Sequence, residues 1–243
     1  MIDLHCHILP GLDDGSESLE ESLAMAAMAA DQGVRHIVTT PHCRTGSAPD
    51  VIDGVAMLQE LLQEEGIPIR LYPGMEIFGS FDTARLLQEK KLLTLNGSRY
   101  PLIEFSFYSD GEAETEILKT VIDAGFTPLV AHPERYEYVC RWPELINRWK
   151  KMGCLFQINR GSLLGRYGDD ARKMGIELVN RGFATVVATD AHSSRVRTPR
   201  AADAYEMLYH SVSPAAAEVL MIQNPKKIIT NKLLPPVEPD WFR

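Results

Sequence analysis

The chain has 243 residues and a mass of 27.2 kDa, a length that allows one or two domains or a single large barrel. Hydrophobic residues make up 45% and charged residues 24%, a globular composition that excludes disordered, collagen-like and disulfide-scaffold chains. The formal net charge is −8 and the pI is near 5.4, so non-specific binding to nucleic acid or to an anionic membrane is disfavoured.

Strand and helix signals begin at the N-terminus. The run from Ile2 to Leu9 alternates and predicts a first strand, followed by a loop that ends at Gly15. A helix is predicted next, because Ser18 and Glu21 have the spacing of a capping box and Gly33 stops an Ala- and Met-rich segment.

Apolar runs alternate with helix-like segments along the rest of the chain. The runs, which predict strands, lie at 35–40, 69–72, 102–105, 127–131, 154–159 and 183–189. The predicted helices lie near 50–65, 82–90, 112–124, 142–152, 169–181 and 200–211. This alternation predicts an α/β fold with a parallel sheet. No Gly-rich phosphate loop follows the first strand, which favours a closed or distorted (β/α) barrel over a dinucleotide-binding sheet.

Domain organisation and cellular location follow from what the chain lacks. Polar loops at 44–49 and 161–168 are short and no linker is visible, so we expect one domain over 1–243. The four cysteines form no Cys-x-x-Cys pair, which predicts neither a thiolate zinc site nor disulfides and fits a reducing cytoplasm. No signal peptide pattern and no run of 18 apolar residues is present, so we expect a cytoplasmic protein without membrane insertion.

Imidazole and carboxylate side chains gather at the predicted strand ends. His5 and His7 share one face of the first strand, while Cys6 points to the other. In a barrel the C-terminal strand ends converge, so groups that are scattered in sequence would meet in one cleft. The full set is His5, His7, Asp14, His42, Glu76, Glu104, His132, Asp190 and His192.

Nine such groups on one face would repel one another unless cations were bound. Mixed nitrogen and oxygen ligands without thiolate suit zinc, manganese or iron, and nine ligands exceed the need of one ion. The residues therefore predict two or three divalent ions.

Two histidines fall outside this set. We interpret them as packing or surface residues, because His36 is at the start of a predicted strand and His210 is in a predicted helix.

Arginines follow closely on these residues at positions 135, 195 and 197. A guanidinium fork matches phosphate oxygens, and divalent ions with guanidinium groups favour phosphoester hydrolysis. A surface ion pair is the alternative for each arginine, and this alternative is strongest for Arg195.

A competing motif is the Cys-x5-Arg spacing of thiolate phosphatases, which Cys154 and Arg160 have. Leu155, Phe156 and Ile158 between them form an apolar strand and not a loop that could bind phosphate, so we reject that mechanism.

In their order, these motifs resemble the PHP (polymerase and histidinol phosphatase) superfamily, and within it the metal-dependent bacterial tyrosine phosphatases of capsule and exopolysaccharide loci. The resemblance runs nearly end to end and rests on segments 1–7, 13–15, 33–42, 74–76, 98–105, 131–136, 189–192 and 224–228. It implies a single distorted (β/α)7 TIM-like barrel that holds three ions.

The resemblance also implies how the ligands divide. One ion would take His5, His7, Glu76 and Asp190, a second Glu76, Glu104 and His132, and a third Asp14, His42 and His192. Glu76 would bridge two ions, and Asp14 matches the family position better than its neighbour Asp13. Manganese is the usual activator of such enzymes, with iron or zinc also compatible.

The implied reaction is hydrolysis of phosphotyrosine on the C-terminal tail of a bacterial tyrosine kinase that regulates capsular or exopolysaccharide synthesis. Arg135 and Arg197 would hold phosphate oxygens, a hydroxide between two ions would attack, and His42 or a metal-held water would assist the leaving oxygen. Two alternatives remain: a small-molecule phosphatase of the histidinol-phosphatase type, and a non-catalytic PHP binding module, which is disfavoured because no ligand position is replaced. No oligomeric state is predicted.

Overall fold

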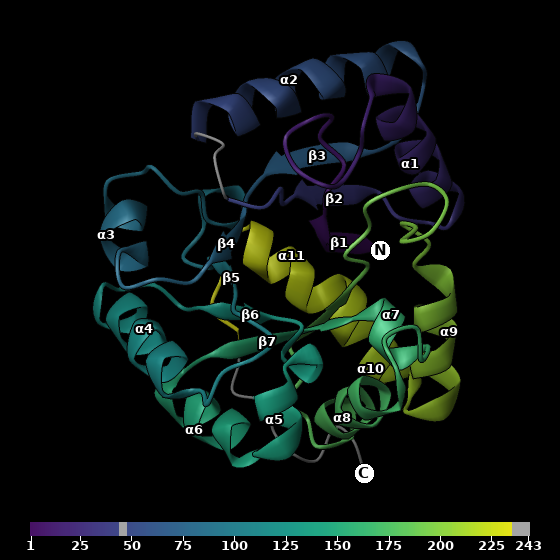
Figure 1. The fold of residues 1–243 in the computed structure, drawn as a ribbon. Helices are drawn as coiled ribbons and strands as arrows, with labels where there is room; N and C mark the ends of the chain where they lie inside the picture. Colours follow the sequence, from purple (N-terminus) through teal and green to yellow (C-terminus); the bar gives the residue numbers. More distant parts are fainter. Residues whose placement is uncertain (44–47, 235–243) are drawn as a thin grey trace.

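Two parallel sheets form the centre of the computed structural model, which describes residues 1–43 and 48–234 (Figure 1). The first sheet has the order β1 (Ile2–Cys6), β2 (His36–Thr39) and β3 (Arg70–Pro73). The second has the order β4 (Glu76–Phe78), β5 (Leu102–Glu104), β6 (Leu129–Ala131), β7 (Leu155–Asn159) and β8 (Val186–Ala188). Every neighbouring pair is parallel, which confirms the predicted α/β class.

Single bridges join the two sheets at two places. Cys6, at the end of β1, bridges Ala191 beyond β8, and the amide of His7 donates to the carbonyl of Ala191 at 2.8 Å. On the other side His42, beyond β2, bridges Glu76 at the start of β4. Within the described ranges these bridges, and not continuous ladders, join the sheets, so the barrel prediction is confirmed only as parallel sheets in edge contact.

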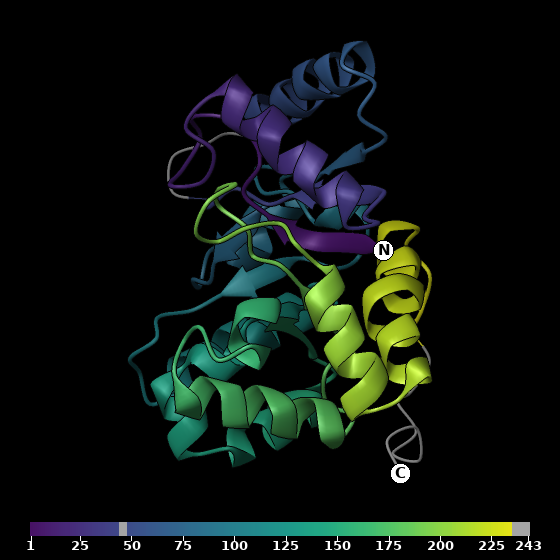
Figure 2. The same cartoon turned by 90° about the vertical axis from the view of Figure 1, so that its right-hand side faces the viewer.

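Helices follow most strands and cover the sheets. The longer ones are α1 (Leu19–Asp31), α2 (Ala48–Glu64), α3 (Thr83–Gln88), α4 (Glu112–Asp123), α6 (Glu144–Met152), α8 (Asp169–Asn180) and α9 (Ala202–Ser211). Short ones that the periodicity did not predict are η1 (Leu95–Gly97), η2 (Pro133–Arg135), α5 (Glu137–Arg141), α7 (Arg160–Leu163), α10 (Pro214–Glu218), η3 (Val219–Gln223) and α11 (Asn224–Ile229). Figure 2 shows the last helices beside the N-terminus.

Among the described helices, none combines the length and apolar character needed to cross a bilayer.

An apolar cluster fills one end of the space between the sheets. It contains Ile2, Leu4, Val38, Leu95, Tyr100, Leu102, Leu129, Ala131, Val186, Ile228 and Ile229. The last two belong to α11. Polar residues follow at the next positions on the same strand faces, since Glu104 lies two residues beyond Leu102 and Gln157 two beyond Leu155, which packs against the cluster. On these two strands the polar side chains therefore lie next to the apolar cluster, one position further along the same strand face.

Several predictions of local structure need correction. Residues 2–9 are all buried instead of alternating, because β1 lies between β2 and the β8 edge and is covered on both faces. Strand β4 was missed, since three residues are too short to show a period. The loop predicted at 161–168 begins inside α7. Of the loop predicted at 44–49, residues 44–47 lie outside the described ranges and the other two begin α2.

The capping box predicted for α1 forms only in part. The hydroxyl of Ser18 accepts a hydrogen bond from the amide of Glu21 at 3.2 Å, as predicted. The carboxylate of Glu21 instead accepts bonds from the amide of Ser194 at 2.6 Å and from its hydroxyl at 3.1 Å. This side chain therefore connects α1 to the loop beyond β8.

Candidate metal centre

The structure brings the nine predicted ligand side chains together where the strands end. Glu76 begins β4 and Glu104 ends β5, while His42 and His132 come shortly after β2 and β6. Seven of the nine residues are buried; His42 is partly exposed, and the side chain of Asp14, in the loop after β1, is 69% exposed. Three groups within the set each offer one ligand atom per residue, with all atoms of a group within 4.8 Å of one another.

The first group is fully buried and consists of His5, His7, Glu76 and Asp190. The Nε2 atoms of His5 and His7 are 3.1 Å apart, and Oε2 of Glu76 lies 3.1 Å from the first and 3.2 Å from the second. Oδ1 of Asp190 lies 3.5 Å from each. This grouping has the composition that the family resemblance implied for the first ion.

The second group consists of His42, Glu76 and Glu104. Nδ1 of His42 lies 2.8 Å from Glu104 and 3.1 Å from Oε2 of Glu76. His132 was expected in this group, but its Nε2 lies 2.8 Å from Oε1 of Glu76, on the other oxygen of that carboxylate. Glu76 is therefore shared by both groups and contacts His132 as well.

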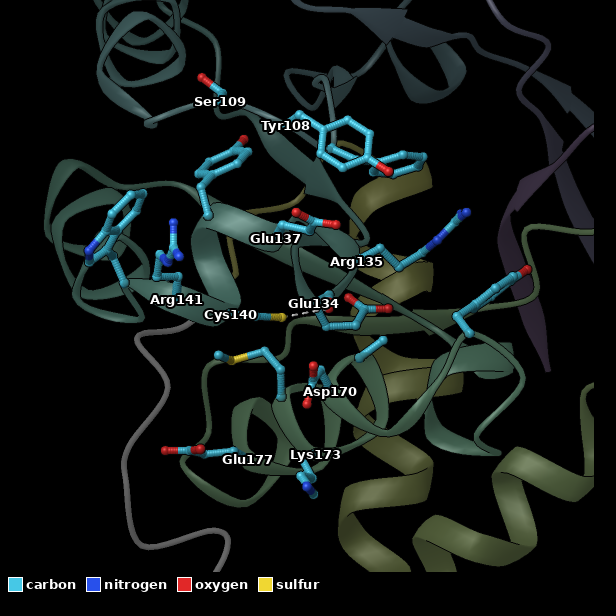
Figure 3. A pocket seen from close by; sticks show the side chains of 16 residues that line it. Tyr108, Ser109, Glu134, Arg135, Glu137, Cys140, Arg141, Asp170, Lys173 and Glu177 are labelled. Carbon is cyan, nitrogen blue, oxygen red and sulfur yellow. Dashed lines mark hydrogen bonds between the residues drawn. The ribbon is translucent and has the colours of Figure 1, made fainter.

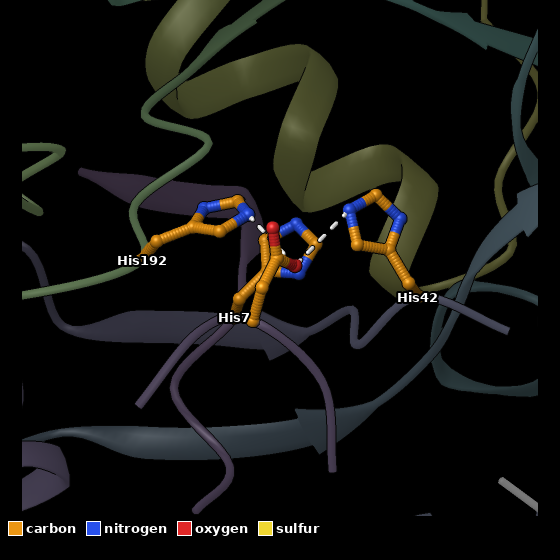
Figure 4. A group of neighbouring side chains, drawn as sticks. His7, His42 and His192 are labelled. Carbon is orange, nitrogen blue, oxygen red and sulfur yellow. Dashed lines mark ion pairs between the residues drawn. The ribbon is translucent and has the colours of Figure 1, made fainter. Parts of the chain in front are cut away.

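The third group adds Asp14 and His192 to His7 and His42. Oδ1 of Asp14 lies 3.5 Å from Nε2 of His42 and 3.7 Å from Nε2 of His192. Figure 4 shows the three imidazoles pointing toward one another. Because Asp14 is the exposed member, this group lies on the solvent side of the cluster.

Unpartnered atoms inside the cluster show that these residues fit metal ions. In the described part of the chain, Nδ1 of His42, Oε2 of Glu76, Oδ1 of Asp190 and Nε2 of His192 are buried and make no hydrogen bond, although the first three lie within 3.1 Å of an ionisable side chain. Buried polar atoms need partners, and carboxylate oxygens and imidazole nitrogens gathered this closely would find them in cations bound between them. The donor set contains imidazole and carboxylate without thiolate, which zinc, manganese and iron accept.

Asp13 and Asp14 have different surroundings, which bears on the choice between them as ligands. Oδ2 of Asp13 lies 2.6 Å from Nδ1 of His7 and accepts a bond from the backbone amide of His42 at 2.8 Å. Burial alone would raise the pKa of Asp13, but the hydrogen bond and charge of His7 lower it to about 2. Asp13 thus orients the ring of His7, and Asp14 is the one that faces the imidazoles of His42 and His192.

Glycine at position 15 lets this loop pass over the first strand. A Cβ atom there would lie 2.3 Å from the carbonyl oxygen of His7 and 2.9 Å from Oδ1 of Asp13. The same Oδ1 accepts the Gly15 amide at 2.9 Å. Only a residue without a side chain permits this approach, which sets the position of both aspartates.

Two amide side chains on β7 form hydrogen bonds to members of the first group. Oε1 of Gln157 lies 2.9 Å from Nδ1 of His5, and Nε2 of Gln157 donates to Oδ1 of Asn159 at 2.7 Å. Nδ2 of Asn159 then donates to Oδ2 of Asp190 at 2.6 Å, and the amide of Asn159 donates to Glu134 at 2.9 Å. Gln157 and Asn159 therefore connect His5 to Asp190, two of the candidate ligands, through buried hydrogen bonds.

Backbone geometry is unusual at two of the nine residues. His132 has φ +32° and Asp190 has φ +52°, both in the left-handed region that residues with a side chain rarely adopt. Near Asp190, the buried carboxylate of Asp3 holds the end of β8 in place, because its oxygens accept from the amide of Thr189 at 3.0 Å and from its hydroxyl at 2.5 Å. Such conformations concentrate at functional sites.

Two arginines border the cluster. Nη1 of Arg135 lies 3.2 Å from Oδ2 of Asp190, and Nη2 of Arg197 lies 2.6 Å from Oδ1. The guanidinium of Arg135 is held between the rings of Phe107, at 4.8 Å, and Tyr167, at 4.2 Å. Arg195 is exposed, whereas the carbonyl of Arg197 accepts the amide of His192 at 2.8 Å.

The competing thiolate mechanism finds no support in the structure. Cys154 is 3% exposed within the core, and burial raises the pKa of its thiol to about 12. Arg160 pairs with Asp203 instead of facing a phosphate-sized loop.

The two remaining histidines lie outside the cluster, in the elements where they were predicted. His36 is at the start of β2 and His210 is near the end of α9.

Comparison with known families decides the relationship. Residues 1–230 match the family described as "Capsular polysaccharide synthesis, CpsB/CapC". The chain belongs to this family. The resemblance drawn from the ordered motifs is thereby confirmed.

Curated relatives of this CpsB/CapC chain are named as tyrosine-protein phosphatases. CpsB of Streptococcus pneumoniae is 33% identical, with 96% of this chain and 100% of the relative covered. YwqE of Bacillus subtilis (strain 168) is 35% identical, with 81% of this chain and 79% of the relative covered. A solved structure of YwqE from B. subtilis and CpsB from S. pneumoniae, described as unique metal-dependent tyrosine phosphatases, superposes with a TM-score of 0.92 at 31% identity and covers 98% of this chain and 99% of that one.

Sequence reasoning missed the supporting residues of this CpsB/CapC site. Gln157 and Asn159 lie two apart in a run that is otherwise apolar and are fully buried. Polar residues at alternate positions of a buried strand share a face and need partners, which was the available signal. Asp3 carried the same signal, as a carboxylate inside the first buried run.

Proposed function

We propose that this protein is a metal-dependent phosphatase that hydrolyses phosphotyrosine on proteins, with the tail of a bacterial tyrosine kinase as its substrate in capsular or exopolysaccharide synthesis. The observation that carries this proposal is the convergence of nine imidazole and carboxylate groups beside two guanidinium groups in a CpsB/CapC-family chain. Relatives named as tyrosine-protein phosphatases, similar over most of their length, support it.

The metal content and the closed form of the fold belong to the same proposal. Two or three divalent ions would be held by His5, His7, Asp14, His42, Glu76, Glu104, His132, Asp190 and His192, with manganese expected and iron or zinc compatible. Bound ions would lower the pKa of water toward neutrality and offset the charge of the phosphate oxygens. A distorted (β/α)7 barrel is the architecture in which all these strand ends face one cleft.

The arginines and His42 have separate parts in the proposed reaction. Arg135 and Arg197 both place nitrogens at the same aspartate, and from this edge of the cluster they would bind the oxygens of the phosphate. The aromatic rings around Arg135 restrict its rotation. The side chain of His42 is 12% exposed, more than any other imidazole of the cluster, so it is placed to assist the leaving oxygen.

The leaving group explains the preference for phosphotyrosine. A phenol has a pKa near 10, several units below that of an aliphatic alcohol, so tyrosine leaves more readily than serine. An enzyme that relies on its ions and arginines should therefore hydrolyse a phosphotyrosyl peptide faster than a phosphoseryl one by orders of magnitude.

The experiment compares kcat/KM for a phosphotyrosyl peptide, the matching phosphoseryl peptide and histidinol phosphate. We expect the phosphotyrosyl peptide to be the best substrate. A preference for histidinol phosphate would make this chain a small-molecule phosphatase, and hydrolysis of none of the three with manganese present would make it a binding module. Incubation with an autophosphorylated bacterial tyrosine kinase then tests the partner, through loss of phosphotyrosine signal.

A further inference from the structure

A large concavity lies beside the cluster and contains none of the nine predicted ligands. Its volume is about 920 Å³, and it is formed by α5, one face of α8 and the loop that follows β5 (Figure 3). Pockets that bind drug-sized ligands usually measure about 300–1,000 Å³. The concavity is therefore large compared with the single phosphate group that the cluster would hold.

Arg135 connects this concavity to the cluster. It lines the concavity together with Phe107 and Tyr167, the two rings that enclose its guanidinium, while its Nη1 lies 3.2 Å from Asp190. A substrate whose phosphate is held by Arg135 would thus have the rest of its chain at the edge of the concavity.

Two aromatic side chains at the concavity are exposed. Tyr108 is 73% exposed and Trp142 is 39% exposed. The backbone at Tyr108 is held locally, because the hydroxyl of Ser106 accepts from the amide of Tyr108 at 3.2 Å and donates to its carbonyl at 3.0 Å. Arg141 lies over the ring of Trp142 at 5.4 Å. Exposed aromatic rings beside a pocket are typical anchors for a bound polypeptide.

Charged side chains of both signs also line the concavity. Glu137 and Asp170 line the concavity with Lys173, and all three are exposed. In the described part of the chain none of the three forms an ion pair within 4 Å, so their charges are available to a ligand. A polypeptide presents amide groups and charged side chains that match such a mixed lining, whereas a small phosphate ester would leave it unused.

We propose that this concavity binds the polypeptide segment adjoining the phosphotyrosine, with Tyr108 and Trp142 packing against that segment. The proposal rests on the proposed function, and it explains how a phosphatase of this geometry distinguishes a protein substrate from a small phosphate ester. Phosphate binding is assigned to the arginines, and polypeptide binding to the concavity.

The test uses the manganese-loaded full chain and the variants Tyr108→Ala, Trp142→Ala and their combination. We expect kcat/KM for a phosphotyrosyl peptide to fall about ten-fold in the double variant, mainly through KM, while kcat/KM for p-nitrophenyl phosphate changes less than about two-fold. Tyr209→Ala is the matched control, because Tyr209 is 43% exposed on α9 and does not line the concavity.

The outcomes separate this proposal from the proposed function. An equal loss for the peptide and for p-nitrophenyl phosphate would show that the rings act on the reaction centre, and an unchanged preference for the peptide would show that it binds elsewhere; either result overturns the docking proposal alone. If the wild-type chain prefers histidinol phosphate to every phosphotyrosyl peptide, the proposed function fails first. Thermal unfolding of each variant verifies that the fold is retained.

Discussion

The amide oxygen of Gln157 lies 2.9 Å from Nδ1 of His5. An amide oxygen can only accept, and the amide nitrogen of Gln157 is engaged with Asn159, so Nδ1 of His5 carries the hydrogen in this network. The lone pair of His5 is then on Nε2, which faces His7 and Glu76. The Gln157 side chain on β7 thus selects the tautomer of His5 that a metal ligand requires.

Replacing Gln157 with Ala should lower the affinity for manganese about 10–100-fold, because His5 would lose its orienting partner. Metal titration of the chelator-treated protein measures this effect independently of turnover. Gln157→Glu keeps an acceptor for His5 and should retain more affinity than the alanine variant. Gln59→Ala is the control, since among the described residues Gln59 hydrogen-bonds to the backbone of Ile69 and Leu71 and to none of the cluster. Equal affinities in wild type and Gln157→Ala would refute the role of the amide.

Removal of divalent ions should abolish hydrolysis of p-nitrophenyl phosphate, because the cluster would be left with facing carboxylates and imidazoles and nothing to activate water. Dialysis against EDTA followed by addition of manganese, iron or zinc measures loss and recovery. Full activity in excess chelator would contradict the proposed site.

Losing Glu76 should be more damaging than losing Asp14. Oε2 of Glu76 lies close to imidazoles of two groups and Oε1 contacts His132, whereas Asp14 belongs to one group at the exposed side. We expect Glu76→Gln to reduce the number of ions per chain by more than Asp14→Asn does. Elemental analysis after gel filtration counts them, and a full complement in Glu76→Gln with near-normal turnover would exclude a bridging role.

The thiol of Cys154 should take no part in turnover. Burial raises its pKa to about 12, and an acid with a raised pKa stays protonated below that value, so the thiolate fraction near pH 8 is negligible. We expect Cys154→Ser to keep kcat/KM within about two-fold, and thiol reagents to react slowly at this position. Loss of activity in this variant, with the fold intact by circular dichroism, would revive the thiolate mechanism.

Most strands and the convergence of the nine candidate residues were predictable from sequence for one shared reason. A buried strand has an apolar run, and a polar residue at its end is conspicuous, which is how Glu104 and Asp190 were found. Parallel strands then place their ends together, so nine distant residues could be predicted to meet.

Features set by long-range contacts could not be predicted in the same way. The single bridges at Cys6 and His42 depend on where two sheet edges meet, which no local pattern encodes. The carboxylate of Glu21 matched a local capping pattern, but a bond to Ser194, 173 positions away, took its place. The choice between Asp13 and Asp14 likewise depended on which one the ring of His7 already occupied.

The hydrogen bonds between Asp3 and Thr189 join positions 186 residues apart in the chain. During synthesis the first strand leaves the ribosome long before its partner exists, and contacts of this range close late because the loop entropy must be overcome first. We therefore expect the candidate ion-binding cluster to be completed at the end of folding. Ions that bind only the complete cluster, in the native state, would then lower the unfolding rate more than they raise the folding rate. Metal loading would therefore control the lifetime of the folded protein and not its rate of folding.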